Sequence, residues 1–271
     1  VGMHMLDQDQ NSGLRGVMEH FHASELVGTL AETGCDTLYF YMSCHMGNCY
    51  YPTKIRPGRT FSYMQGRDYF GEVAAECVQN KIALVAVYEF ENMHFQQTPG
   101  YVPKDWNHYR KQPDGTVKAR LCWNGGYGTF VMDQIREVAS RYPVAGFYVD
   151  MLDYPGRDLC PACGKRFREE FGQAPPDLAC PLESPLMKEY RLWTFREHGR
   201  YLKRLRDMVE TLIPGGTVVT NCHYLRDEDL YIQSEATSYL SNDPGNGCTF
   251  SCRAVPAFTP KLFRALSEGK P

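Results

Sequence analysis

The chain has 271 residues, of which 43% are hydrophobic and 23% charged, so it can bury one large core and has an ordinary globular composition. Its formal net charge is −3 with acidic and basic residues interspersed, which argues against a nucleic-acid partner, and no stretch approaches the roughly 20 apolar residues that a membrane helix needs. The 11 cysteines are spread along the chain, unlike the framework of a small disulfide-rich domain, so most are expected to be reduced thiols.

Short apolar runs rich in β-branched and aromatic residues alternate with helical patterns along the chain. Runs of this kind predict buried strands at 2–6, 37–42, 82–88, 145–150 and 217–221, with a weaker sixth at 231–235 and a seventh near 253–258. Strands that alternate with helices predict repeated βα units around a parallel sheet.

The intervening segments carry apolar residues at helical spacing, over 70–78, 131–142 and 185–212. An earlier helix is expected between Ser24, as its N-terminal cap, and Gly34, as its stop. Pro185 suits the first turn of the long third segment, and the stretch Pro214-Gly215-Gly216 is expected to end it.

Loops of unequal length separate these elements. The loops after strands are long, at 43–66, 89–126 and 151–185, whereas the returns before strands are short. This asymmetry favours a (β/α)8 TIM barrel, whose active site lies at the carboxyl ends of the strands. A doubly wound sheet is the main alternative, but no glycine-rich phosphate motif follows the first strand. Because only six to seven βα units can be counted, we expect 1–271 to form a single barrel domain that is truncated at its C-terminus.

The segment Gly146-Phe147-Tyr148-Val149-Asp150 carries the strongest catalytic signal. An apolar strand ends in a carboxylate and is followed by a polar loop with glycine and proline. In a barrel this carboxylate points into the mouth, where it can act as nucleophile or stabilise an oxocarbenium-like transition state. Asp153 is a nearby alternative, and the plain structural interpretation is a helix cap or a loop ion pair.

Glycosidases usually need a second carboxyl group. Glu235 ends the expected sixth strand, where it would face the same mouth and could act as the acid/base. Glu89 and Glu91 follow the third strand, and either could serve instead as the acid or bind a sugar hydroxyl.

Other polar and aromatic groups also fall at strand ends and could bind a sugar. Histidine and amide side chains there suit hydroxyl groups, and aromatic rings suit the apolar face of a sugar, although core packing is at least as good an interpretation for the rings. The candidate substrate-binding residues are His4, His45, Tyr88, Glu89, Trp123, Asn124, Asn221 and His223.

The stretch Cys160-Pro161-Ala162-Cys163-Gly164-Lys165 has the form of half a zinc knuckle. A tetrahedral site needs two more ligands, which Cys122, Cys180, Asp158 or a loop histidine could supply. A disulfide or reduced thiols are the alternatives. A bound zinc would have a structural role, and no cofactor is expected to be needed for catalysis.

Several stretches together resemble a family of glycosyl hydrolases related to α-L-fucosidases and to proteins that carry a β-galactosidase trimerisation domain. They are Val1 to Leu6, Tyr50-Tyr51-Pro52-Thr53, Leu121-Cys122-Trp123-Asn124 with Tyr127, Tyr142-Pro143-Val144 through Asp150, and Cys160-Pro161-Ala162-Cys163 with Phe167-Arg168.

The resemblance implies that Asp150 takes the place of the fucosidase nucleophile at the end of the fourth strand. Similarity to the zinc cluster of family 42 β-galactosidases implies that Cys122, Cys160 and Cys163 are ligands, with Asp158 where the family has a fourth cysteine. The resemblance also implies a homo-oligomer that forms through C-terminal domains, which we expect to lie outside residues 1–271.

Three hypotheses follow. The first is a retaining glycosidase that cleaves an α-L-fucoside-like or related glycan, with Asp150 as nucleophile and Glu235 as acid/base. The second is a carbohydrate-binding barrel without catalysis, which would have no carboxyl group within about 10 Å of Asp150. The third, a zinc-dependent hydrolase, lacks an HExxH motif or any dense cluster of histidine and aspartate.

Overall fold

A computed structural model describes most of the chain between residues 20 and 241. The described residues are 2–3, 20–43, 47–55, 60, 64–89, 107–111, 117–150, 161–177, 179–181, 183–221 and 227–241. They belong to two compact units, the first formed by Val1–His94, Met132–Met151 and Met208–Val218, the second by Phe95–Val131, Leu152–Asp207 and Val219–Pro271. None of the described helices is both long and apolar enough to span a membrane.

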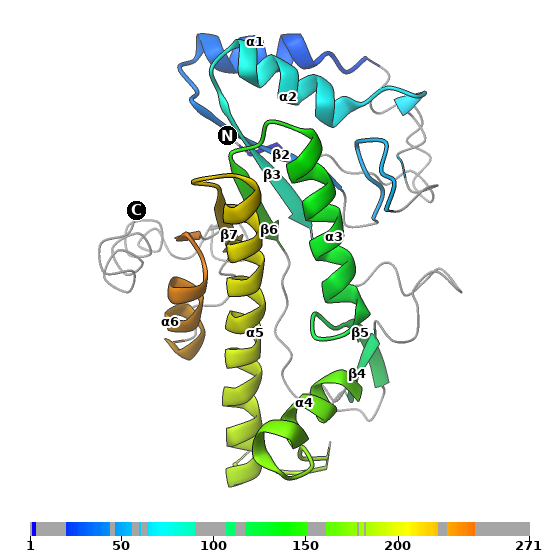
Figure 1. The fold of residues 1–271 in the computed structure, drawn as a ribbon, viewed down its shortest axis with the longest axis vertical. Helices are drawn as coiled ribbons and strands as arrows, with labels where there is room; N and C mark the ends of the chain where they lie inside the picture. Colours follow the sequence, from blue (N-terminus) through cyan, green and yellow to red (C-terminus); the bar gives the residue numbers. More distant parts are fainter. Residues whose placement is uncertain are drawn as a thin grey trace, which may run out of the picture. The chain divides into compact units, whose positions relative to one another are not determined.

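The first unit contains a parallel sheet in the order β1 (Gly2–Met3), β2 (Thr37–Tyr41), β3 (Ala83–Glu89) and β6 (Gly146–Asp150) (Figure 1). The strands predicted at 37–42, 82–88 and 145–150 are therefore confirmed to within one residue. The next strand, β7 (Thr217–Asn221), begins in this unit, where the Thr217 amide donates a hydrogen bond of 3.1 Å to the Ala145 carbonyl.

Helices cover one face of this sheet. They are α1 (Ala23–Glu32), α2 (Tyr69–Gln79) and the C-terminal part of α3 (Gly126–Arg141). The Phe40 ring of β2 lies 6.2 Å from the Phe70 ring of α2, and the Tyr88 hydroxyl of β3 donates to Gln134 of α3 at 2.9 Å. Since side chains alternate along a strand, every second residue of β2, β3 and β6 faces the helices.

The ends of the first two helices follow from local backbone chemistry. Gly34 follows α1 with a φ of 76°, and its amide and that of Cys35 donate to Ala31 and Leu30, so the predicted glycine stop is confirmed. The predicted Ser24 cap is wrong, because the helix begins at Ala23 and Ser24 lies within its first turn. α2 has a side-chain cap, since Asp68 accepts from the Gly71 amide at 2.8 Å.

The second unit contains the antiparallel pair β4 (Asn107–Lys111) and β5 (Val117–Leu121), then α4 (Pro161–Phe171) and most of α5 (Pro185–Leu212). The long helix predicted from Pro185 is confirmed, including its end before Pro214-Gly215-Gly216. The last elements are α6 (Asp227–Ala236) and β8 (Tyr239–Ser241), which pairs in parallel with the end of β7.

The strand predicted at 231–235 is wrong, because these residues belong to α6. Three acidic residues, 227–229, precede them and are favourable at a helix N-terminus. Gln233, Ala236 and Thr237 are buried at helical spacing, and Gln233 accepts hydrogen bonds from the amide and hydroxyl of Thr237. The predicted mixed α/β fold with parallel strands is confirmed at this level, while the seventh strand near 253–258 lies outside the described residues.

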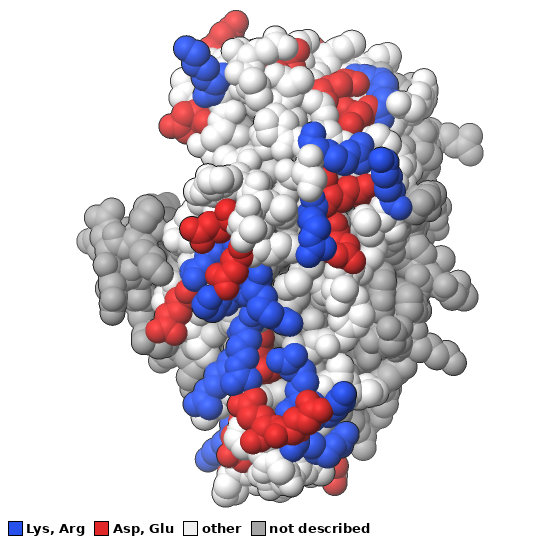
Figure 2. All heavy atoms as spheres, viewed as in Figure 1, with Lys and Arg blue, Asp and Glu red and all other residues white. Residues whose placement is uncertain are grey.

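Charged side chains of both signs lie interspersed over the face shown in Figure 2. The described helices carry exposed ion pairs one helical turn apart, such as Lys203 with Asp207 and Arg136 with Asp133. Exposed pairs of this kind contribute little stability each, about 0.3–0.5 kcal/mol.

Candidate active site and cysteine pocket

Two carboxyl side chains stand next to each other at the carboxyl edge of the sheet in the first unit. Asp150 is the last residue of β6, Glu89 is the last residue of β3, and the two are Cα partners in the register of these parallel strands. Neighbouring strands lie about 4.8 Å apart, and register partners on parallel strands project to the same side. The fold therefore places both carboxyl groups together on one face.

That face is the one turned away from α2 and α3. The residues just before the pair, Tyr88 and Val149, are register partners too, and Tyr88 reaches α3 through its hydrogen bond to Gln134. Alternation then directs Glu89 and Asp150 to the opposite side. Asp150 is half-buried and Glu89 is 7% exposed, so the pair is sheltered while one member keeps access to solvent.

Tyrosines occupy the same face one and two rows below the carboxyl pair. Tyr41 and Tyr148 are aligned with Val87, and Tyr39 lies a further row down. The Tyr39 and Tyr148 rings meet edge to face with centroids 5.6 Å apart. All three tyrosines are half-buried, so aromatic side chains lie on the same face of the sheet as the two acids.

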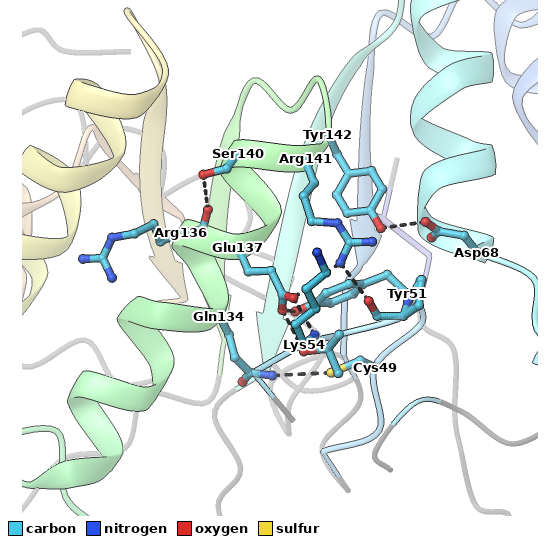
Figure 3. A network of polar contacts seen from close by, with 12 residues as sticks. Cys49, Tyr51, Lys54, Asp68, Gln134, Arg136, Glu137, Ser140, Arg141 and Tyr142 are labelled. Atoms are coloured by element: carbon cyan, nitrogen blue, oxygen red, sulfur yellow. Dashed lines mark hydrogen bonds and ion pairs between the residues drawn. The ribbon is translucent and has the colours of Figure 1, made fainter. Parts of the chain in front are cut away.

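A polar network fixes the loop that follows β2 against α3 (Figure 3). The Glu137 carboxylate accepts from the Tyr51 hydroxyl at 3.1 Å, the Thr53 hydroxyl at 2.7 Å and the Lys54 amide at 2.6 Å. Arg141 adds an ion pair to Glu137 and a hydrogen bond of 2.8 Å to the Pro52 carbonyl. The Arg141 to Glu137 pair lies within α3, whereas each of the other contacts joins residues more than 80 positions apart in the sequence. These contacts hold the loop against α3.

Aromatic contacts complete this network. The Arg141 guanidinium lies 5.6 Å from the Tyr51 ring centroid and 5.1 Å from that of Tyr142. The Tyr142 hydroxyl donates to the Asp68 carboxylate at 2.6 Å. Burial is the main cause that raises the pKa of Tyr51 and of Tyr142, so both phenols keep their protons and remain donors.

The second unit contains a narrow pocket lined by sulfur, indole and amide groups. Its lining residues are Cys122, Trp123, Asn124, Cys163, Trp193, Thr194 and Glu197. The Sγ atoms of Cys122 and Cys163 lie 3.6 Å apart, too far for a disulfide bond of about 2.05 Å. The Asn124 amide nitrogen lies 3.5 Å from the Cys163 Sγ and donates to it.

A buried carboxylate joins α4 to α5 beside this pocket. The Glu197 side chain is 2% exposed and pairs with Arg166 at 2.6 Å and with Arg200 at 2.5 Å. Arg200 also forms two hydrogen bonds with Glu170, whose carboxylate accepts from the Trp193 indole at 3.0 Å. The hydrogen bond from Arg200 is the main cause that lowers the pKa of Glu170.

His198 packs against Trp123 with ring centroids 5.2 Å apart. Burial lowers the pKa of His198 to about 3, so the imidazole is neutral at neutral pH. Trp123 is 4% exposed and fills this part of the core, which favours the packing interpretation over stacking on a sugar.

The other predicted site residues divide into those with a described place and those without. Tyr88 faces α3, as described above, and Asn221 is buried at the end of β7 beside the strand partner Ser241. Glu235 is exposed on α6, so the strand-end position that suggested it is wrong. The positions outside the described residues are His4, His45, Glu91, Asp153, Asp158, Cys160 and His223.

Sequence reasoning missed Glu197. The residue belongs to the buried stripe of α5 that also contains Tyr190, Trp193 and Tyr201, at helical spacing. A carboxylate inside such a stripe requires a charged partner. That interruption of an apolar stripe was the available signal.

Comparisons with known proteins bear on the residues of the candidate site. Residues 22–151, which include both Glu89 and Asp150, match the model of a family described as hypothetical glycosyl hydrolase 6. No curated protein matches the chain.

Among solved structures, the chain is similar to α-L-fucosidase isoenzyme 2 from Paenibacillus thiaminolyticus, with a TM-score of 0.62 and 16% identity over 90% of this chain and 36% of that one. It is also similar to the β-galactosidase of the psychrophilic Marinomonas ef1, with a TM-score of 0.62, 12% identity and coverage of 93% and 46%. A third similar structure is the β-galactosidase of Bacillus circulans sp. alkalophilus, with a TM-score of 0.60, 16% identity and coverage of 92% and 42%.

The chain thus spans less than half the length of each of these three structures, and the likeness concerns the fold. The resemblance predicted from the sequence is confirmed: residues 22–151 match a glycosyl hydrolase family model, and an α-L-fucosidase and β-galactosidases are among the structural neighbours of the chain.

Proposed function

We propose that the protein is a retaining glycoside hydrolase that cleaves an α-L-fucoside-like or related glycan, with Asp150 as its nucleophile. The observation that carries the proposal is the position of Asp150 at the carboxyl end of a parallel strand, on the face free of α2 and α3. Active sites of (β/α)8 barrels lie at this end of the strands, and we infer a barrel for the complete arrangement.

The identity of the second carboxyl group decides between catalysis and binding alone. A carbohydrate-binding relative without catalysis would lack a carboxyl group within about 10 Å of Asp150. Glu89 is its register partner on the adjoining strand, which supports a catalytic site over the binding module. Glu235 lies on a helix and not at the end of a strand, so only its residue type still supports it as the acid/base.

The proposal predicts hydrolysis with retention of anomeric configuration. The protein would be incubated with a panel of aryl glycosides that includes α-L-fucosides and β-D-galactosides, and the first sugar product would be followed by proton NMR. We expect turnover of an α-L-fucoside with the α anomer formed first, because two displacements at the anomeric carbon restore its configuration. The β anomer as first product would contradict the nucleophile role, and absence of turnover across the panel would contradict the enzyme.

We further propose that Cys122 and Cys163 belong to a structural zinc site. Four ligands at about 2.3 Å from a tetrahedral zinc are roughly 3.8 Å apart, and the Sγ atoms of this pair lie 3.6 Å apart. The hydrogen bond from Asn124 to the Cys163 sulfur is of the kind that orients metal ligands. Cys160 and Asp158 are the proposed remaining ligands.

Metal analysis of the purified protein tests this site. We expect about one zinc per chain, lost in Cys163→Ser together with a fall in Tm of about 5–10 °C, because a structural metal stabilises only the folded state. Cys35→Ser is the matched control, since Cys35 lies in the first unit and is expected to leave the zinc content unchanged. A metal-free wild-type protein, or one whose zinc survives Cys163→Ser, would contradict the proposal.

A further inference from the structure

We infer that Glu89 is the acid/base partner of Asp150, so that the two carboxyl groups at the ends of β3 and β6 form one coupled catalytic pair. The inference rests on the proposed function, and it replaces Glu235 with a residue that the described fold brings to the nucleophile. No other carboxyl group in the described residues is a register partner of Asp150.

The spacing of the pair suits a retaining enzyme. Register partners on neighbouring parallel strands have Cα atoms about 4.8 Å apart, and their side chains leave the same face. Retaining glycosidases keep their two carboxyl groups about 5–5.5 Å apart, whereas inverting enzymes need about 6.5–9.5 Å to admit a water molecule. Adjacent strands therefore suit the shorter separation.

The surroundings assign the proton to Glu89. It is 7% exposed, whereas Asp150 is half-buried, so desolvation disfavours the ionised form of Glu89 more strongly. The nearby Asp150 carboxylate has the same effect, since two close carboxyl groups do not readily both ionise. The titratable groups that share this face on β2, β3 and β6 are otherwise Tyr39, Tyr41 and Tyr148.

The chemistry balances with these two groups and water. A carboxylate oxygen of Asp150 forms a bond to the anomeric carbon while the glycosidic bond breaks, and the Glu89 proton passes to the departing oxygen. Glu89, now ionised, then takes a proton from a water molecule as the water oxygen attacks the anomeric carbon. The bond to Asp150 breaks, and both carboxyl groups return to their first state.

The first test needs no substrate. Glutamate labelled with carbon-13 at its carboxyl carbon would be incorporated into the protein, and the Glu89 signal would be identified by its absence in Glu89→Gln. We expect Glu89 to titrate at a higher pH than exposed glutamates, and its midpoint to fall by about one unit in Asp150→Asn, where the neighbouring charge is removed. An ordinary midpoint that is indifferent to Asp150→Asn would overturn the inference.

The second test compares leaving groups. Glu89→Gln is expected to reduce kcat/KM at least about 100-fold for aryl glycosides with poor leaving groups. The loss should be far smaller for a dinitrophenyl glycoside, because the dinitrophenolate leaving group departs without a proton. Azide is expected to restore turnover and to yield a glycosyl azide with the configuration of the substrate. Glu25→Gln is the matched control, because Glu25 is exposed on α1, and it should behave as the wild type.

The outcomes separate this inference from the proposed function. The wild type could turn over glycosides while Glu89→Gln lowers kcat/KM by the same factor for every leaving group. In that case Glu89 is not the acid/base, but the proposed hydrolase activity is supported. If Glu89 shows the coupled titration but the wild type hydrolyses no glycoside of the panel, the proposed function fails while the proton-sharing pair is supported.

Discussion

Asp150→Gly is expected to lower kcat/KM for an aryl α-L-fucoside by on the order of 10⁴-fold or more, because it removes the proposed nucleophile. The substitution also leaves a space where the carboxylate stood. Azide can enter this space and attack the anomeric carbon directly, in one displacement instead of two. The product is expected to be a glycosyl azide with configuration inverted relative to the substrate.

The configuration of the glycosyl azide is the decisive measurement for Asp150, and proton NMR of its anomeric signal determines it. Asp150→Asn is the matched variant, since it removes the charge without opening the space and should be inactive with or without azide. Asp133→Asn, on the exposed surface of α3, should retain wild-type rates. Loss of less than about tenfold in Asp150→Gly, or a retained azide product, would remove Asp150 from the nucleophile role.

The two acids illustrate what the sequence could and could not predict. Asp150 could be found because an apolar run ends in a carboxylate, and a strand end at this residue is confirmed. The place of Glu89 depended on which strands pair, since β4 and β5 intervene in the sequence but form a separate antiparallel pair. Pairing across such an insertion is not encoded in local periodicity.

Glu235 was misplaced for a local reason. Its short segment has no clear period, and a run of five residues fits a strand or one and a half helical turns equally well. The acidic residues at 227–229 were the better guide, because they favour the N-terminus of a helix. The hairpin of β4 and β5 was missed because both strands carry several charged residues, although Pro113-Asp114-Gly115 between them is a typical turn sequence.

The sequence already named Cys122 and Cys163 as candidate ligands of one site, but the distance between their sulfur atoms could not be predicted from it. A CxxC motif predicts two sulfur ligands close in sequence, but Cys122 lies 41 residues before Cys163, and the fold brings their sulfurs to 3.6 Å. Contacts between α4 and α5, through Glu197 and its two arginines, help to set this approach. Such long-range contacts follow from packing and leave only weak traces in the sequence.

Gly146→Ala is expected to lower the free energy of unfolding by about 3 kcal/mol or more and the Tm by about 10 °C. Gly146 begins β6, and a Cβ atom there would lie 2.3 Å from both the carbonyl oxygen and the Oγ1 of Thr217, and 2.8 Å from its amide nitrogen. Two of these three atoms belong to the backbone, so a change of side-chain rotamer cannot relieve the overlap. The strand that carries Asp150 can approach Thr217 this closely only with glycine at its first position.

Gly28→Ala is the matched control and should change stability in the opposite direction. Gly28 lies within α1, where an added Cβ would meet no atom within 4 Å, and alanine is the better helix former by about 0.8–1 kcal/mol. Thermal and urea unfolding followed by circular dichroism would measure both variants. A Tm of Gly146→Ala within about 2 °C of the wild type would show that Thr217 does not lie against β6, and the strand arrangement that places Asp150 beside Glu89 would then lose one of its supports.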